Sequence, residues 1–387
     1  MHATDHLAEA SRLMTVCNSC RYCEGLCAVF PAMELRRNFA DGDLNYLANL
    51  CHSCGACYQD CQFSPPHEFN VNVPRTLAEV RADSYQAYAW PAALQPLFNR
   101  NGLWIAAISA VSVAAFILGF AAWHDPEVLW STDGNFYRLM PHNVMAGLFG
   151  AVFLFALLAM AMGLRAFWRD IGASSVAAGS GGSLWQAIKD AGQLRYLDGG
   201  GVGCYNEDEY PTDRRRLFHH LTFYGFMLCF AATSTGTIYH YVFGWEAPYG
   251  YLSLPKLFGI PGGIGLVIGP IGLLHAKLQR HADLRDPNQF GMETAFLAML
   301  FATGLSGLVL MVARETAALA PLLALHLGVV FALFLTMPYG KFVHGLYRFA
   351  ALVLYAAERK AEQPATPGAA IVTAKPLDAA AGVRSAG

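Results

Sequence analysis

The chain has 387 residues, of which 55% are hydrophobic and only 14% are charged, and its mean hydropathy is +0.33. This composition is too apolar for an ordinary soluble protein of that length, so it predicts a membrane protein. The formal net charge is −2, and no basic field therefore indicates a nucleic acid as a partner.

Cysteines are concentrated near the start of the chain, where eight of the ten lie between Cys17 and Cys61. The residues before Cys17 contain no apolar run typical of an export signal, so we expect this segment to stay in the cytoplasm. In that reducing compartment, closely spaced cysteines usually bind metal rather than form disulfides. We expect residues 1–83 to form a small helical domain that binds metal.

Residues 84–101 are rich in aromatic residues and prolines, a composition typical of a segment that lies among lipid headgroups. Six uncharged stretches then follow, each long enough to cross about 30 Å of hydrocarbon. They cover approximately residues 103–123, 144–164, 217–243, 257–274, 294–313 and 317–339. We therefore expect an interfacial linker at 84–101 and a transmembrane bundle at 102–345, with both termini on the same side of the membrane.

The distribution of basic residues predicts which side that is. The loop of residues 165–216 contains seven arginines and lysines and the loop after the fourth span three more, whereas the opposite loops hold few. By the positive-inside rule, both termini lie in the cytoplasm and the chain crosses a bacterial inner membrane. Residues 346–387 are expected to hold the end of a helix and then a disordered tail, since the tail is rich in Ala, Pro, Gly and Thr.

The cysteines form two copies of the spacing C-x2-C-x2-C-x3-C. In this motif three thiolates bind one iron–sulfur cubane, and the fourth binds the neighbouring cluster. The spacing therefore predicts two [4Fe–4S] clusters with crossed ligands. The first is held by Cys17, Cys20, Cys23 and Cys61, and the second by Cys51, Cys54, Cys57 and Cys27.

Zinc is the alternative, but it usually binds two CxxC pairs separated by a longer loop, which explains a duplicated pattern poorly. The segment between Cys27 and Cys51 has a helical pattern, and the domain resembles the helical ferredoxin domains of succinate dehydrogenase and heterodisulfide reductase subunits. The fold class is thus all-α, a helical ferredoxin domain fused to a six-span bundle. Cys204 and Cys229 have no partners at ligand spacing. We expect Cys204 to be a loop residue and Cys229 to be a small buried residue of the third span.

Histidines in or beside the predicted spans indicate a cofactor, because ionisable residues are costly in a membrane. His326 and His344 would share one face of a straight helix about 27 Å apart, although Pro338 lies between them and would introduce a kink. Antiparallel packing would place His240 with His326 toward the outer side of the membrane. It would place His219 or His220 with His344 toward the inner side.

Each such pair is a candidate set of axial ligands for a b-type haem, which predicts one or two haems. The alternative is that these histidines are interfacial or hydrogen-bonded within the bundle. His275 could replace one of the inner ligands, and a solvated or capping role is expected for His52, His67, His124, His142 and His281. No glycine-rich dinucleotide or phosphate motif occurs, so electrons should come from another protein.

Two blocks of sequence resemble the tricarballylate-utilisation B family, also called citrate-utilisation B. The first runs from Tyr196 to Tyr241 and includes LDGGGVGCYNEDEYPTDRRRLFHH and TIYHY, and the second is LSLPKLFGIPGGIGLVIGP. Together with the cysteine repeats, the resemblance covers about residues 14–345.

The resemblance implies a membrane partner of a soluble FAD-dependent tricarballylate dehydrogenase. Such a protein would reoxidise the flavin and pass electrons through the clusters and haem to quinone, as an oxidoreductase without substrate chemistry of its own. His219, His220 and His240 lie within the HH…YHY block that carries the resemblance.

The rival hypothesis is a transporter or sensor with a regulatory metal domain. The predicted spans contain no Asp, Glu, Lys or Arg for a substrate or proton relay, which disfavours transport. The long loop 165–216 and the cysteine domain are together the predicted docking surface for the dehydrogenase. Its acidic residues Glu207, Asp208 and Glu209 and its basic residues Arg214, Arg215 and Arg216 would steer the partner. Alternatively, the arginines only enforce topology.

Overall fold

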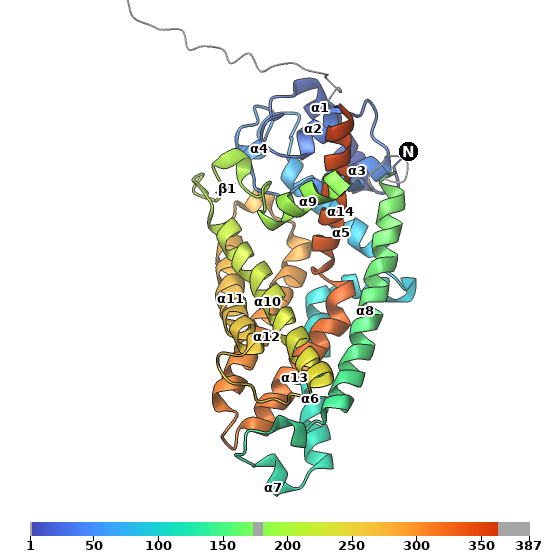
Figure 1. The fold of residues 1–387 in the computed structure, drawn as a ribbon. Helices are drawn as coiled ribbons and strands as arrows, with labels where there is room; N and C mark the ends of the chain where they lie inside the picture. Colours follow the sequence, from blue (N-terminus) through green and yellow to red (C-terminus); the bar gives the residue numbers. More distant parts are fainter. Residues whose placement is uncertain (1, 173–180, 363–387) are drawn as a thin grey trace, which may run out of the picture.

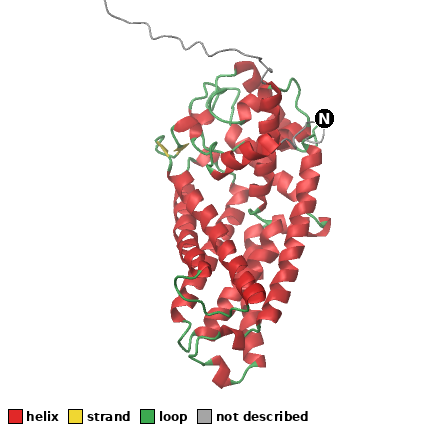
Figure 2. Ribbon diagram, in the orientation of Figure 1, coloured by secondary structure: helices red, strands yellow, loops and turns green. Residues whose placement is uncertain are grey.

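The computed structural model describes residues 2–172 and 181–362, and the statements below concern those residues. A small helical domain formed by the N-terminal part of the chain sits at one end of a long helix bundle (Figure 1). Almost all regular structure is helical (Figure 2), and the described part of the chain contains one two-stranded sheet. The predicted all-α fold class is confirmed.

The N-terminal domain is built from five helices: α1 (Asp5–Cys20), α2 (Val29–Glu34), α3 (Asp41–Leu50), α4 (Ala56–Gln59) and α5 (Val73–Ala87). The side chains of Thr4 and Asn72 accept hydrogen bonds from the first turns of α1 and α5, which is the usual role of an N-cap residue. Fully buried side chains such as Leu13, Phe30 and Tyr46 form the core. The cysteines lie at the ends of these helices and in the loops between them.

Six helices in the rest of the chain are long and apolar enough to cross a membrane. They contain α6 (Asn101–Trp123), α8 (His142–Asp170), α10 (Arg214–Phe243), α11 (Leu254–Leu278), α12 (Phe290–Ala313) and α13 (Leu319–Thr336). Large apolar side chains on their surfaces are exposed, including Val111 at 69%, Val242 at 70% and Val312 at 76%. Such a surface suits lipid rather than water. The chain is a multi-pass membrane protein.

Short helices connect these elements. The segment before α6 contains the 3₁₀ helix η1 (Ala92–Phe98), and the far end of the bundle carries α7 (Pro126–Leu129) and η2 (Phe136–Arg138). Two more 3₁₀ helices, η4 (Ala282–Leu284) and η5 (Pro287–Gln289), lie between α11 and α12.

Helices α10 and α11 pack closely because glycines line their contact. A Cβ atom on Gly225 would lie 3.0 Å from Gly262 O, and one on Gly262 would lie 2.8 Å from the backbone nitrogen of Cys229. Any larger side chain at these positions would push the helices apart. The glycines of the fourth span therefore permit close contact between these two helices. Cys229 is partly buried there, against Gly262.

The long loop between α8 and α10 has structure of its own. Residues 173–180 lie outside the described residues, and the chain then forms α9 (Gly181–Gly192), η3 (Gly199–Gly201) and a hairpin of β1 (Cys204–Tyr205) and β2 (Pro211–Thr212). The backbone nitrogen of Tyr205 donates to Cys54 O at 2.9 Å. The loop therefore packs directly on the cysteine domain.

The C-terminal part of the chain differs from the expectation. Helix α13 ends at Thr336, the 3₁₀ helix η6 (Met337–Tyr339) follows, and a separate helix α14 (Val343–Glu362) then begins. Pro338 therefore breaks the helix, and His344 does not continue the face of His326. The described part of 346–387 is more than a helix end, because α14 packs against α3 of the N-terminal domain and α9 of the long loop, and its residues Tyr347, Leu354 and Tyr355 are buried. The predicted disordered tail, after residue 362, lies outside the described residues.

Candidate iron–sulfur and haem sites

Four cysteines come together at the end of α1, and we call them the first cysteine group: Cys17, Cys20, Cys23 and Cys61. The pKa of the Cys17 thiol is raised to about 12 by burial and by the nearby thiols of Cys23, Cys61 and Cys20. Arg21, at the C-cap of α1, adopts a left-handed conformation with φ 55°, which turns the chain directly after Cys20. Cys61 reaches this group from the second repeat.

The other four, Cys27, Cys51, Cys54 and Cys57, form the second cysteine group. Burial raises the pKa of Cys57, and the next largest causes are its neighbours Cys54, Cys27 and Cys51. Gly55 has φ 92° before α4, a conformation that strongly favours glycine and that directs the chain from Cys54 toward Cys57. The structure thus places Cys27 with the second repeat and Cys61 with the first, as crossed ligation requires.

The first cysteine group opens to the surface. A cavity of about 240 Å³ is lined by its four cysteines, Cys57, Asp60 and the half-buried Phe63. Cys20 is exposed, and the side chain of Tyr22 beside it is 73% exposed. Within the described residues, no three Cys, His, Asp or Glu side chains converge closely enough to hold a single metal ion. In a cubane each thiolate binds a different iron atom, so its ligands stand further apart.

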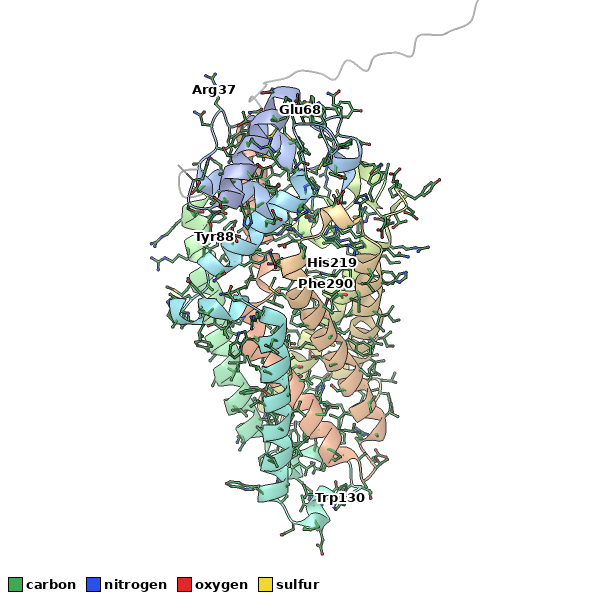
Figure 3. The ribbon with its side chains drawn as sticks, turned by 180° about the vertical axis from the view of Figure 1, so that it is seen from behind. Arg37, Glu68, Tyr88, Trp130, His219 and Phe290 are labelled. Carbon is green, nitrogen blue, oxygen red and sulfur yellow. The ribbon has the colours of Figure 1, made fainter. Side chains whose placement is uncertain are left out.

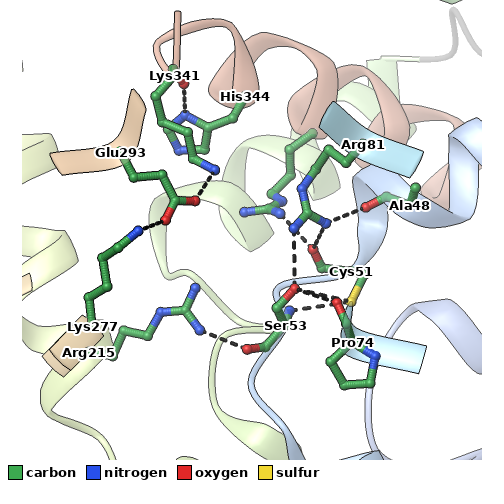
Figure 4. Close-up of polar contacts among 11 residues, drawn as sticks. Ala48, Cys51, Ser53, Pro74, Arg81, Arg215, Lys277, Glu293, Lys341 and His344 are labelled. Atoms are coloured by element: carbon green, nitrogen blue, oxygen red, sulfur yellow. Dashed lines mark hydrogen bonds and ion pairs between the residues drawn. The ribbon is translucent and has the colours of Figure 1, made fainter. Parts of the chain in front are cut away.

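The second cysteine group is surrounded by arginines. Arg81 donates to Cys51 O at 3.0 Å (Figure 4). Arg348 also donates to Cys51 O, at 2.7 Å, and Arg215 donates to Ser53 O at 3.0 Å. These three arginines, which we call the arginine layer, come from α5, α14 and α10. The layer joins the cysteine domain to the bundle.

Cys204 lies beside this group. It is buried at the start of β1, packs near Cys54, and is one cause of the raised pKa of the Cys54 thiol, about 11, after burial itself. Its Sγ lies 4.0 Å from Arg215 Nη1. The expectation of a mere loop residue is wrong because the hairpin folds back onto the cysteine domain, and no sequence spacing reveals such a contact.

At the end of the bundle next to the cysteine domain, His219 on α10 faces His344 on α14, with ring centroids 6.1 Å apart and an interplanar angle of 72°. His219 lies close to the N-terminal domain, whereas Trp130 marks the opposite end (Figure 3). Nδ1 of His344 lies 2.5 Å from Lys341 O, and no hydrogen bond to its Nε2 occurs among the described residues. His220 instead contacts Tyr224, with ring centroids 5.8 Å apart, so the structure selects His219 from the two inner candidates as the neighbour of His344.

The outer histidines are arranged differently from the expectation. Nδ1 of His326 lies 2.9 Å from Ser306 Oγ, and the ring packs against Gly307 of α12. His240 stacks on His142, with centroids 3.6 Å apart at 17°. The structure thus does not bring His240 and His326 into ring contact. The position of His142 at the end of a span predicts a solvated or capping role, and nothing in the sequence indicates its contact with His240 of α10.

His275 lines a small cavity of about 20 Å³ together with Cys54, Arg215 and Arg280. Side-chain nitrogens of Arg280 are buried there without a hydrogen-bond partner among the described residues. Burial, followed by the charge of Arg215, lowers the pKa of Arg280 to about 10. This cavity therefore has a strongly positive wall next to the second cysteine group.

Charged residues lie at the ends of several spanning helices, and Glu293 of α12 is one of them. Glu293 lies in the first turn of α12 and accepts hydrogen bonds from Lys277 and from Lys341, the latter at 2.6 Å (Figure 4). The predicted spans contain no charged residue within their expected bounds, but the helices extend beyond those bounds to charged residues such as Glu293. The expected span began one residue later, because helix ends are poorly defined by hydropathy alone. Lys277 of α11 and Lys341, in the turn before α14, both pair with Glu293, which gives the carboxylate a structural role between α11, α12 and this turn.

A helical domain with two cysteine repeats on a six-helix membrane bundle defines a membrane protein of the iron–sulfur electron-transfer class. Comparison with known proteins supports this class. The family model "Citrate utilization protein B Fer4-like domain" matches residues 10–87, and "Citrate utilization protein B" matches residues 97–365. Citrate utilization protein B of Escherichia coli is 48% identical over 358 residues, 92% of this chain and 94% of that protein. No solved structure matches the chain significantly. The chain belongs to the citrate utilization protein B family.

Proposed function

We propose that this protein is the membrane electron-transfer partner of a soluble FAD-dependent tricarboxylate dehydrogenase, with tricarballylate as the first candidate substrate. Reduced flavin would release two electrons and two protons, and a quinone would take up two electrons and two protons. The chain would carry the electrons one at a time between them. The observation that supports this most directly is the alignment of two cysteine groups and a histidine pair along one route from the surface to the bundle.

The donor atoms fit the groups that this function needs. Four thiols in each cysteine group, arranged in the crossed pattern, suit two [4Fe–4S] clusters. The 6.1 Å between the rings of His219 and His344 leaves room for an iron atom bound by one nitrogen of each, since metal–imidazole bonds are about 2 Å long. When bound, the clusters and a b-type haem would supply one-electron redox chemistry.

The protein groups around these sites have defined roles. Lys341 O orients the ring of His344, and Ser306 Oγ holds Nδ1 of His326, so that Nε2 of each ring is available to a metal. We therefore keep His326 and His240 as the proposed ligands of an outer haem, which would require the two side chains to meet across the space between α10 and α13. His142 is the competing partner of His240.

The docking surface for the dehydrogenase is proposed to lie where the long loop covers the cysteine domain. Glu207, Asp208 and Glu209 are exposed in the turn between β1 and β2, next to the Cys54 loop. Arg215 is turned inward, and Arg216 pairs with Asp213 at 2.7 Å, so the basic triplet is not one surface patch. The acidic turn is thus the part of the loop best placed to meet a partner. Both termini and this surface are proposed to face the cytoplasm across an inner membrane.

The function is tested with the purified chain in lipid nanodiscs, mixed with the FAD-dependent dehydrogenase. Tricarballylate should reduce the cofactors of the chain only when the dehydrogenase is present, and a short-chain quinone should then reoxidise them. If dithionite reduces the cofactors but substrate and dehydrogenase do not, the proposed partner is wrong. A regulated transporter would show neither reaction.

A further inference from the structure

We propose that the arginine layer makes the cluster of the second cysteine group the more easily reduced of the two clusters, so that electrons run from the protein surface toward the bundle. This inference rests on the proposed function, because it requires that both groups hold [4Fe–4S] clusters. It adds the order of the two carriers and the residues that set this order.

The charges of the arginine layer are not neutralised locally. Arg81 donates to Ala48 O at 2.8 Å and to Cys51 O, Arg348 donates to Cys51 O, and Arg215 donates to Ser53 O. All of these acceptors are uncharged carbonyls. None of the three arginines takes part in an ion pair with another described residue. Three full positive charges therefore act on the second cysteine group.

Adding an electron to a cluster bound by four thiolates makes its net charge more negative. Fixed positive charges nearby stabilise the reduced form and raise the reduction potential, as net charge and hydrogen bonding do for these clusters in general. Burial has the opposite effect, since it removes the water that would solvate the added charge. Here the guanidinium groups replace that water, and their effect is weakly screened because Arg81 is only 7% exposed.

The first cysteine group has different surroundings. The carboxylate of Asp60 lines its cavity, and a negative charge there disfavours an added electron. Its neighbouring cation, Arg21, is exposed and donates to Asn18 O at 3.0 Å, so salt and water screen it. The two environments thus push the potentials apart in the direction that favours transfer from the first group to the second.

The layer also lies next to the exit from the second group. Arg215 precedes His219 by one turn of α10, and Arg348 follows His344 by one turn of α14, so each arginine shares a helix face with one of the paired histidines. The same residues that stabilise an electron on the second cluster therefore stand between it and the proposed haem.

Redox titration of the purified full-length protein, followed by paramagnetic resonance, tests this. Two cluster signals with separate midpoint potentials are expected. Asp60→Asn should raise the potential of one of them and so identify the first group without removing a ligand. The other signal should have the higher potential in the unmodified protein.

Arg348→Gln and Arg215→Gln should each lower the higher midpoint potential and leave the lower one unchanged. Arg348→Lys keeps the positive charge, so it should lower the higher potential much less than Arg348→Gln. Arg21→Gln is the matched control and should leave the second group unchanged. The inference is overturned if the Asp60-sensitive cluster has the higher potential, or if the Gln variants shift neither potential. If the protein shows no cluster signal at all and contains zinc, the proposed function itself fails.

Discussion

His219 and His344, far apart in the chain, face each other with ring centroids 6.1 Å apart at the junction of the bundle and the cysteine domain. The helix α14 that carries His344 packs against the cysteine domain, while α10 belongs to the bundle. The proposed inner haem would therefore be held by both parts of the protein. In the proposed function, the histidine pair would connect the clusters of the cysteine domain to the membrane bundle.

Replacing either member of this pair should remove the same haem, because loss of one axial nitrogen leaves the iron incompletely held. We expect His219→Ala and His344→Ala to lose one haem each and the same reduced absorption band. Haem content by pyridine haemochrome and the reduced-minus-oxidised spectrum measure this. His220→Ala is the matched control and should keep its haem; a normal spectrum in His219→Ala would exclude that residue as a ligand.

The outer haem is tested in the same way with three variants. His240→Ala and His326→Ala are each expected to abolish it, and Ser306→Ala should weaken its binding about 10–100-fold, as loss of a group that orients a ligand usually does. His142→Ala should keep it. The reverse pattern, with haem lost in His142→Ala and kept in His326→Ala, would make His142 the partner of His240.

Cys61→Ser should remove the cluster held by Cys17, Cys20 and Cys23, although Cys61 belongs to the other repeat. Cys27→Ser should likewise remove the cluster held by Cys51, Cys54 and Cys57. Paramagnetic resonance of the reduced protein, with Asp60→Asn used to recognise the first cluster, separates the two signals. Loss of the second signal in Cys61→Ser would show that the ligands are not crossed.

Glu293→Gln should destabilise the bundle, because it leaves the ammonium groups of Lys277 and Lys341 without their carboxylate. Breaking such a partly buried ion pair costs about 3 kcal/mol. Glu315→Gln is the control, since Glu315 pairs with Arg314 but its side chain is 69% exposed, and its loss should cost below about 1 kcal/mol. Thermal unfolding in detergent measures both; equal midpoints would remove the structural role of Glu293.

Reversing the acidic turn, with Glu207, Asp208 and Glu209 changed to lysine, should slow flavin reoxidation and alter its salt dependence. Glu127→Lys on α7, at the opposite end of the bundle, is the control and should have no effect. Stopped-flow measurement of the flavin at several ionic strengths makes the comparison. An unchanged rate and salt dependence in the triple variant would contradict the docking role of the acidic turn. The arginines of the loop would then only enforce topology.

Features that repeat along the chain could be predicted from the sequence. The spans follow from long apolar runs, and the crossed grouping of Cys27 and Cys61 follows from the fixed spacing of the two repeats. Features that depend on how distant segments meet could not be predicted. Cys204 reaches the cluster site only because a hairpin folds back, and His142 meets His240 only because two helix ends lie side by side.

Helix α14 is a further example. Its sequence is amphipathic rather than uniformly apolar, so hydropathy alone marks it as the end of a span. Its role becomes clear only when Arg348 is seen to donate to Cys51 O at 2.7 Å. The ring geometry of proline predicts a kink at Pro338, but the complete break and the direction of the chain after it depend on packing against the cysteine domain.

The central claim is that this chain is a redox carrier and not a regulated transporter, and its metal content tests that claim most directly. The protein purified from membranes under anaerobic conditions is analysed for iron, acid-labile sulfide, zinc and haem. The account predicts iron and sulfide sufficient for two [4Fe–4S] clusters per chain, together with b-type haem that dithionite reduces. A colourless protein that contains zinc, without sulfide or haem, would contradict it.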